Sequence, residues 1–259
     1  MQEMTTGYGL VEAPLWDAAR GLYFSDVHNG GVFLLDCGGK VSTVIPKRRG
    51  VGGMALHADG GLIVGGKNIA HVKNGETKVL LSPDDVPGII GFNDFTTDAA
   101  GRIYVGSLAF KVFSEEPKPG FLHVIDLDGS MRTLTDGVIL TNGLGFSPDG
   151  KTLYHSDARA GHLRAYDVKP DGSVGPWRVF VEMGEGRVPD GLKVASDGSV
   201  WVADARGSRV AIFEASGRHR DDLAVPLPMV TSLCFGGDDL KDLYVVTGSD
   251  HSGRENCGT

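Results

Sequence analysis

The chain has 259 residues, of which 41% are hydrophobic and 22% charged, and no apolar stretch approaches the ~20 residues that a membrane-spanning helix needs. Its formal net charge of −8 argues against nucleic acid as a partner, because that binding relies on clustered Lys and Arg. We therefore expect one domain over residues 1–259 that binds neither a membrane nor nucleic acid.

Two features bear on the compartment. The N-terminal segment MQEMTTGYGLVEAP lacks a basic region followed by an apolar one, so no secretion signal is predicted. The three cysteines, Cys37, Cys234 and Cys257, lack metal-site spacing and are odd in number, which favours reduced thiols. Both features predict a cytoplasmic protein. The sequence leaves open whether it is a monomer or a dimer.

Six similar units follow one another along the chain. Each has a short apolar strand, a turn rich in Asp and Gly, and a strand with an aromatic or β-branched centre. The units open at intervals of roughly 40 to 49 residues, which is the spacing of β-propeller blades. In chain order the opening residues are Glu12, Gly52, Asn93, Asn142, Asp190 and Thr231.

Most units continue with two further strands, such as HLRAYDV and WRVFVEM. The sequence therefore predicts an all-β fold, a six-bladed β-propeller with four-stranded blades. The last blade is incomplete, since only SDHSGRENCGT follows LYVVTG, and we expect TTGYGLV near the N-terminus to supply its outer strand. The segment GSLAFKVFSEEPKPGF contains two prolines and mixed charges, which suggests a surface loop that covers one end.

The opening residues predict a ring around the propeller axis, because equivalent residues of the blades lie equivalently around it. Those with oxygen-bearing side chains are Glu12, Asn93, Asn142 and Asp190. Two carboxylates and two amides in a confined space need a cation, and Ca²⁺ suits such mixed ligands best. The alternative is that each residue only forms a turn with its own backbone.

Other polar residues have different expected roles. The aspartates assigned to hairpin turns are Asp59, Asp149 and Asp197. Three further aspartates end the predicted second strands: Asp26, Asp157 and Asp204. We expect them either to support the ring or to serve the structure of the blades alone. Among the histidines, His155 is the one predicted on a strand that can reach the channel, as a substrate contact. No GxSxG, P-loop or GxGxxG motif supports a serine hydrolase or nucleotide site.

Five segments of the chain form a specific set when they are taken in order. They are EAPLWD with LYFSD, GFNDFTTDAAGRIYVGS, TNGLGFSPDGKTLYHSD, PDGLKV with GSVWVAD, and TSLCFGGDDLKDLYVVT. As a set they resemble the successive signatures of the senescence-marker-protein, regucalcin and gluconolactonase family, from Glu12 to Thr247. The resemblance implies a six-bladed propeller with one divalent cation in its channel and lactone hydrolysis as the commonest activity.

The resemblance also implies roles for individual residues. By motif, Glu12, Asn142 and Asp190 match the cation ligands of that family. The expected ion is Ca²⁺, with Zn²⁺, Mn²⁺, Mg²⁺ or Fe²⁺ as alternatives. Asn93 matches a residue that contacts the substrate or a water beside the metal, and Asp190 also serves as the general base. Family members that act on sugar lactones have Arg at the place of Gly91, and some have Glu where counting reaches Lys111.

The sequence thus predicts a metal-dependent hydrolase that opens a lactone by attack of an activated water, with a small molecule as its partner. The alternatives are a phosphotriesterase-like hydrolase and a non-catalytic propeller that binds calcium or small molecules. Because Gly91 and Lys111 replace residues that grip sugar hydroxyls, and VPGIIGF (86–92) and LAFKVF (108–113) are apolar, we expect a less polar lactone. These apolar residues can instead pack the loop against the propeller.

Overall fold

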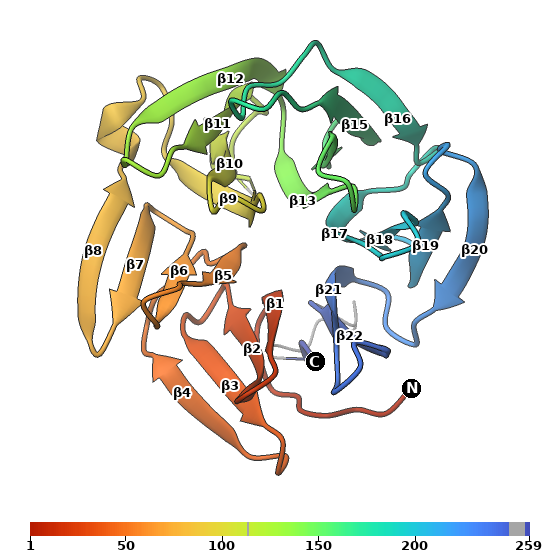
Figure 1. Cartoon of the computed structure of the whole chain (residues 1–259). Helices are drawn as coiled ribbons and strands as arrows, with labels where there is room; N and C mark the ends of the chain where they lie inside the picture. Colours follow the sequence, from red (N-terminus) through yellow and green to blue (C-terminus); the bar gives the residue numbers. More distant parts are fainter. Residues whose placement is uncertain (113, 249–256) are drawn as a thin grey trace.

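The computed structural model describes residues 1–112, 114–248 and 257–259. Over these residues the chain forms six sheets that follow one another around a central axis (Figure 1). Five of these sheets have four strands and the sixth has two. The prediction of an all-β, six-bladed propeller with an incomplete last blade is confirmed. No helix in the described ranges is long and apolar enough to cross a membrane.

Each blade is a meander of antiparallel strands, with the first strand nearest the axis. The inner strands of blades 1 to 6 are β1 (Val11–Asp17), β5 (Met54–Leu56), β9 (Gly91–Thr97), β13 (Thr141–Phe146), β17 (Pro189–Val194) and β21 (Val230–Gly236). The second strands are β2 (Gly21–Asp26), β6 (Leu62–Val64), β10 (Ile103–Leu108), β14 (Thr152–Asp157), β18 (Val200–Asp204) and β22 (Asp242–Thr247). The third strands of blades 1 to 5 are β3 (Val32–Asp36), β7 (Ile69–Lys73), β11 (Gly120–Ile125), β15 (His162–Asp167) and β19 (Arg209–Phe213).

The fourth strands form the rim of the propeller and are mostly exposed. They are β4 (Val41–Ile45), β8 (Glu76–Leu81), β12 (Met131–Val138), β16 (Arg178–Glu182) and β20 (His219–Ala224). A short 3₁₀ helix, η1 (Pro83–Asp85), lies between blades 2 and 3. The predicted turn role of Asp149 and Asp197 is confirmed, since Asp149 Oδ1 accepts from Lys151 N at 3.1 Å and Asp197 Oδ1 from Ser199 N at 2.9 Å.

The core consists of apolar clusters that each lie between two neighbouring blades. Between blades 3 and 4, for example, Tyr104 and Leu122 pack with Leu153. Six such clusters join the six blades in turn, including one in which Val11 and Phe24 of blade 1 meet Val246 of blade 6. The packing of neighbouring sheets therefore closes the ring, and among the described residues of the complete blades a single bridge, Gly66 with Phe92, pairs one blade with the next.

Blade 6 differs from the other blades at its outer side. Instead of a full strand, the N-terminal segment contributes one bridge, in which Gly258 N donates to Tyr8 O at 2.7 Å. Thr247 N, at the end of β22, donates to Thr259 O at 2.9 Å. The expected outer strand is thus reduced to Tyr8, which pairs with the C-terminal residues rather than with β22. The rest of the predicted tail, residues 249–256, lies outside the described residues.

Side-chain hydroxyl groups connect the inner parts of neighbouring blades. Thr231 Oγ1 donates to Val11 O at 2.6 Å and approaches Val246 O at 3.1 Å, so this residue of β21 links blade 6 to blade 1. Ser25 Oγ lies 2.6 Å from Val51 O and links blade 1 to blade 2. Both side chains are buried, so a carbonyl that loses this donor cannot turn to water instead.

We expect Thr231→Val to lower the free energy of unfolding by about 1–3 kcal/mol, because the isosteric side chain leaves the buried Val11 carbonyl without its donor. Urea denaturation followed by fluorescence measures the change. Thr43→Val, at an exposed position on β4, is the matched control and should change stability by less than about 0.5 kcal/mol. Equal stability of the two variants would mean that the Thr231 hydroxyl does not hold the ring closed.

Candidate functional site

In every described blade except blade 2, a β-bulge interrupts the inner strand at or near the opening residue. In β13, Thr141 pairs with Asp157 and Leu144 with His155, so Asn142 and Gly143 lie together opposite one residue of β14. A bulge of this kind bends the strand and turns a side chain out of the regular alternation. The bulge therefore sets the direction of the Asn142 side chain.

The same irregularity recurs in β17 and β1. In β17 the register shifts between Pro189 and Leu192, and the shifted residues include Asp190. In β1 it shifts between Glu12 and Leu15, and Ala13 adopts a φ of 53°, in the left-handed region that favours glycine. Asn142 and Asp190 thus share one local geometry, whereas Glu12 pairs with Ser25 and directly precedes the bulged residues of β1.

The bulge in β9 brings a further acid to the site. Phe92 pairs with Ser107 and Phe95 with Val105, so Asn93 and Asp94 together face the single residue Gly106. Sequence reasoning missed Asp94, because regular strand alternation turns neighbouring residues to opposite faces. The sequence signal for Asp94 was its place directly after Asn93, since glycine follows the opening residues Asn142 and Asp190.

Glycines allow the bulged strands to approach one another. A Cβ atom on Gly143 would overlap the backbone of Leu192, and one on Gly52 would lie 2.6 Å from Asn93 Oδ1. The opening residue of blade 2 is therefore small because the Asn93 side chain needs its space. We call Glu12, Asn93, Asp94, Asn142 and Asp190 the axial cluster.

Three acids of the axial cluster act on one another. Burial raises the pKa of Glu12 well above its usual value, and the charges of Asp190 and Asp94 add to the increase. Burial also raises the pKa of Asp190, and Asp94 again contributes. The pKa of Asp94 is raised to about 6 by burial, with Lys193 and the Phe95 backbone N–H opposing the change. The cluster therefore carries more negative charge than its surroundings favour.

The two amides of the axial cluster are linked directly. Asn93 Nδ2 donates to Asn142 Oδ1 at 2.7 Å and to Thr141 O at 2.7 Å. Both hydrogens of the Asn93 amide are thereby used, so its Oδ1 remains as an acceptor. Asn142 Oδ1 keeps a second lone pair after accepting this bond.

The aspartates that end three second strands hold the segments that lead into the axial cluster. Leu10 N lies 3.4 Å from Asp26 Oδ1, Leu140 N lies 3.1 Å from Asp157 Oδ1, and Val188 N lies 3.4 Å from Asp204 Oδ1. Each of these N–H groups belongs to the residue two positions before Glu12, Asn142 or Asp190. We expected these aspartates either to support the ring or to serve the blades alone. They bind the backbone just before each site residue and so hold it in position.

The loop between β10 and β11, whose described residues are 109–112 and 114–119 and which we call the lid loop, packs against the segments that lead to Asn142 and Asp190. Phe110 is 0% exposed and packs with Leu140, Ala158 and Val188, which flank the approaches to Asn142 and Asp190. Arg159 Nη2 also donates to Val112 O at 3.1 Å. Phe110 therefore anchors the loop to blades 4 and 5 and does not face a ligand. Phe113 lies outside the described residues.

The structure does not bring the other predicted substrate contacts into the axial cluster. Lys111 is exposed on the lid loop, and its Nζ lies 3.6 Å from Glu115 Oε1. His155 is fully buried within β14, where desolvation lowers its pKa to about 3, and its ring lies beside that of Tyr166. The structure therefore encloses this ring and does not place it in the axial cluster. Gly91 is buried at the start of β9, against the backbone of Gly66.

The donor chemistry of the axial cluster suits a hard divalent cation. Glu12 and Asp190 offer carboxylate oxygens and Asn142 an amide oxygen, which are ligands that Ca²⁺ prefers. In the described ranges, no group of three or more His, Cys, Asp or Glu side chains is arranged to hold a metal ion. A cation bound here would therefore depend on the amide oxygen of Asn142 as well as on the acids.

The fold and the axial cluster together define a six-bladed β-propeller with acids and amides gathered at one end of its axis. The chain belongs to the SMP-30/gluconolactonase/LRE-like family, whose model matches residues 10–249. The family suggested by the sequence motifs is thereby confirmed.

Several relatives of known name are lactonases. The pentonolactonase XacC of Haloferax volcanii is 32% identical, over 98% of this chain and 87% of its own length. The 6-deoxy-6-sulfogluconolactonase of Pseudomonas putida is 31% identical, over 95% and 86%. Among solved structures, a calcium-binding regucalcin of Agrobacterium tumefaciens has a TM-score of 0.85 at 20% identity, over 99% of this chain and 90% of its own. That structure supports the fold alone.

The raised pKa of Asp94 makes the stability of the metal-free protein depend on pH. The folded pKa of about 6 lies above the usual 3.8. Ionisation of Asp94 therefore does not lower the free energy of unfolding below about pH 4, and lowers it fully above about pH 6. We expect Asp94→Asn to stabilise the metal-free protein at pH 8, by up to about 3 kcal/mol, and to have little effect at pH 4.

Urea unfolding in the presence of a chelator, at both pH values, measures this difference. The exposed Asp136→Asn is the matched control and should leave stability unchanged at both. A loss of stability at pH 8 in Asp94→Asn, or an equal change at the two pH values, would contradict the electrostatic account.

Proposed function

We propose that this protein is a metal-dependent lactonase, which hydrolyses a cyclic ester with the help of one divalent cation held by Glu12, Asn142 and Asp190. The observation that carries the proposal is the position of Asn142 and Asp190 in equivalent bulges and of Glu12 directly before a third bulge, with the pKa of both acids raised by burial and by neighbouring acids. In the described part of the chain no Lys, Arg or His forms an ion pair with Glu12 or Asp190. A cation would relieve their repulsion.

The chemistry assigns different tasks to the residues of the axial cluster. When bound, a divalent cation such as Ca²⁺ polarises the carbonyl group of a lactone and stabilises the charge that develops on its oxygen. Asp190 takes a proton from the water that attacks the carbonyl carbon. The ring C–O bond then breaks, and Asp190 returns the proton to the departing ring oxygen. The product is the open hydroxy acid.

Asn93 orients the reactants. Because its Nδ2 is engaged by Asn142 and Thr141, its Oδ1 accepts a hydrogen bond from the water or from a substrate hydroxyl. The same two bonds hold the Asn93 side chain still, which is what a positioning group requires. Asn93 also fixes Asn142, so it connects the water or substrate to the proposed cation ligands.

The substrate class follows from where the apolar residues lie. Val86, Ile89 and Phe92 are buried between blades 2 and 3, and Phe110 is buried where the lid loop meets blades 4 and 5. Among the described apolar residues expected to contact a less polar ring, Ile90 is exposed, at 47%, and Leu108, Ala109 and Val112 are half-buried. This arrangement weakens the case for an alkyl lactone. Two relatives are named as a pentonolactonase and a 6-deoxy-6-sulfogluconolactonase. We therefore propose a sugar-derived lactone as the substrate.

Two other functions fit the same fold and are separated by experiment. A phosphotriesterase-like hydrolase would use the same cation and base on a phosphorus centre. A non-catalytic calcium-binding propeller would need the cation ligands but no base, and one structural neighbour is named as a calcium-binding protein. The proximity of Asp94 to Asp190 favours catalysis, since a site that only binds a cation does not need a further acid with a raised pKa.

We expect one divalent cation to bind per chain, and Glu12→Gln to weaken Ca²⁺ binding at least tenfold in calorimetric titration, because a charged ligand becomes neutral. Asp190→Asn should lower kcat for lactone hydrolysis by about 10²–10⁴-fold through loss of the base. The control is Asp221→Asn, on exposed β20, which should change neither quantity. Unaltered kcat in a folded Asp190→Asn protein would remove Asp190 from the mechanism.

We expect kcat/KM to be at least tenfold higher for a pentonolactone or hexonolactone than for an alkyl γ-lactone or δ-lactone of the same ring size, with the same metal loaded. A tenfold preference corresponds to about 1.4 kcal/mol of transition-state binding. Proton release monitored by a pH indicator measures both. Preference for the alkyl lactones would mean that Ile90 and the lid loop recognise an apolar substituent, and hydrolysis of phosphotriesters alone would point to the other hydrolase class.

A further inference from the structure

Charged residues are divided unequally between the two ends of the propeller. Inner strands begin and second strands end at the end that holds the axial cluster, since Thr141 pairs with Asp157 and Pro189 with Asp204. The connecting segments at this axial end, from the β2–β3 turn to the β20–β21 segment, contain nine Lys or Arg and five Asp or Glu. The turns at the opposite end, from β1–β2 to β21–β22, contain seven and ten. The axial end is therefore the basic end of an acidic protein.

The basic residues of the two ends also differ in their partners. Most of those in the turns at the opposite end form a salt bridge with a nearby acid: Arg20, Arg102, Lys151, Arg218 and Lys241. In the connecting segments at the axial end, Lys111 and Arg187 are the two that do so with a described residue. Six exposed basic residues there form no salt bridge with any described acid: Lys47, Arg49, Lys67, Lys118, Arg159 and Arg206. Their charges are available to a ligand.

Lys67 lies beside the segment that leads to Asn93. It follows Gly66, whose carbonyl oxygen accepts from Phe92 N at 2.9 Å. A Cβ atom on Gly91 would lie 3.6 Å from Lys67 Cα. Because a lysine side chain keeps its charged end in water, the ammonium group of Lys67 stays accessible from the solvent at this end of blade 3.

Arg159 and Arg206 lie in the corresponding turns of blades 4 and 5. Ala158 N, directly before Arg159, donates to the carbonyl oxygen of Leu140 at 2.9 Å, two residues before Asn142. Arg206 N lies 3.2 Å from Asp204 Oδ1, the oxygen that also approaches the backbone N–H two residues before Asp190. Three exposed cations thus belong to turns that bind, directly or through Asp204, the segments leading to Asn93, Asn142 and Asp190.

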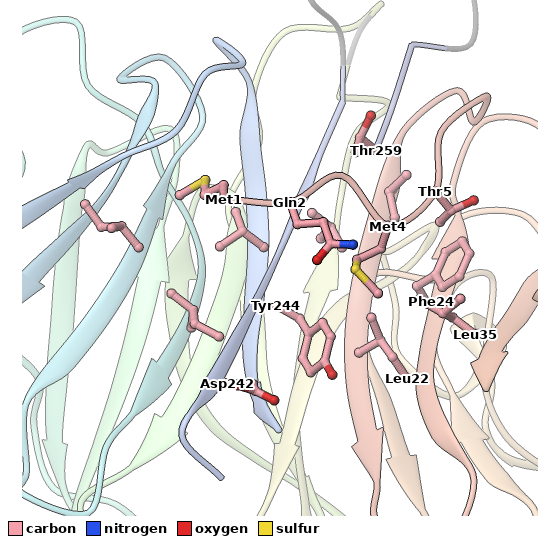
Figure 2. A pocket seen from close by; sticks show the side chains of 15 residues that line it. Met1, Gln2, Met4, Thr5, Leu22, Phe24, Leu35, Asp242, Tyr244 and Thr259 are labelled. Atoms are coloured by element: carbon pink, nitrogen blue, oxygen red, sulfur yellow. The ribbon is translucent and has the colours of Figure 1, made fainter. Parts of the chain in front are cut away.

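The cavity of about 540 Å³ beside blade 6 has a different character (Figure 2). Among its described lining residues the one charged side chain is the carboxylate of Asp242. Most of the others are apolar, such as Leu22, Phe24 and Leu243. An anionic ligand is therefore favoured at the axial end and not in this cavity.

We propose that the substrate is a sugar-derived lactone that carries an anionic group such as a carboxylate, which Lys67, Arg159 and Arg206 attract and bind at the axial end. This inference rests on the lactonase function proposed above and adds the charge of the substrate. The three acids of the axial cluster would repel an anion, but a bound divalent cation and Lys193 would offset their charge. Unpaired cations around the entrance then speed the association of an anion, and a guanidinium group binds a carboxylate through charge-assisted hydrogen bonds.

A matched pair of lactones tests the proposal. D-glucaro-1,4-lactone differs from D-glucono-1,4-lactone in carrying a carboxylate in place of the terminal hydroxymethyl group. With the same metal loaded and about 0.01 M salt, we expect kcat/KM to be at least fivefold higher for the glucarolactone. At about 1 M salt the difference should fall below twofold, because the Debye length shortens from about 30 Å to about 3 Å.

Two double variants locate the recognition. Lys67→Gln with Arg206→Gln removes two positive charges at the axial end and should lower the glucarolactone-to-gluconolactone ratio of kcat/KM at least threefold at low salt. Lys40→Gln with Lys169→Gln removes the same charge from exposed residues at the opposite end and should leave the ratio unchanged. Circular dichroism and melting curves establish that both variants fold. Equal kcat/KM for the two lactones at low salt, or the same ratio in both double variants, would overturn the proposal.

Failure of the lactonase function itself gives a different result. If protein that binds Ca²⁺ in calorimetric titration hydrolyses neither lactone, the lactonase proposal fails. Recognition of the anionic group is then measured by calorimetric titration with gluconate and glucarate, the open-chain products, with Ca²⁺ in excess. At least tenfold tighter binding of glucarate, lost at about 1 M salt and in Lys67→Gln with Arg206→Gln, would support the anion site. Equal binding of the two products would overturn it.

Discussion

The geometry of the candidate site depends on hydrogen bonds between three carboxylates and the backbone that leads into three inner strands. Asp157 accepts from both Ile139 N and Leu140 N, at 3.1 Å each, and Ala158 N donates back to Leu140 O at 2.9 Å. Leu140, two residues before Asn142, is therefore held by both its N–H group and its carbonyl group. Because a buried carboxylate strengthens the bonds it accepts, this support resists movement of the bulge that follows.

The same support occurs only in part of the ring, and its distribution follows the proposed ligands. Asp26, Asp157 and Asp204 stand in the blades of Glu12, Asn142 and Asp190. In blade 3 the corresponding residue is Ser107, whose hydroxyl bonds within its own blade, accepting from Phe121 N at 3.0 Å. In blade 6 it is Thr247, which pairs with Thr259. The backbone before the inner strand is thus held in the three blades that carry the proposed ligands, where a cation would demand fixed distances between its ligands.

The sequence was sufficient to predict the blades and to single out Glu12, Asn142 and Asp190 as candidate site residues, because both depend on a repeat that can be aligned. It could not predict Asp94 as a site residue, since a bulge in β9 overrides strand alternation there. His155 lies in the regularly paired strand β14 and is fully buried, so a position on a strand near the channel did not by itself indicate exposure to the channel. The direction of loop side chains such as Phe110 depends on packing between distant segments, which no local pattern records.

Charge balance supports the proposed divalent ion over an ion of another charge. Glu12, Asp94 and Asp190 contribute three negative charges when ionised, and Lys193 is the cationic side chain that lowers the pKa of Asp94. One divalent cation together with Lys193 would bring the sum to zero. A monovalent ion would leave one acid uncompensated and a trivalent ion would overcompensate, each at a cost that grows as water is excluded. Amides rather than acids at positions 93 and 142 keep this balance while still providing oxygen atoms.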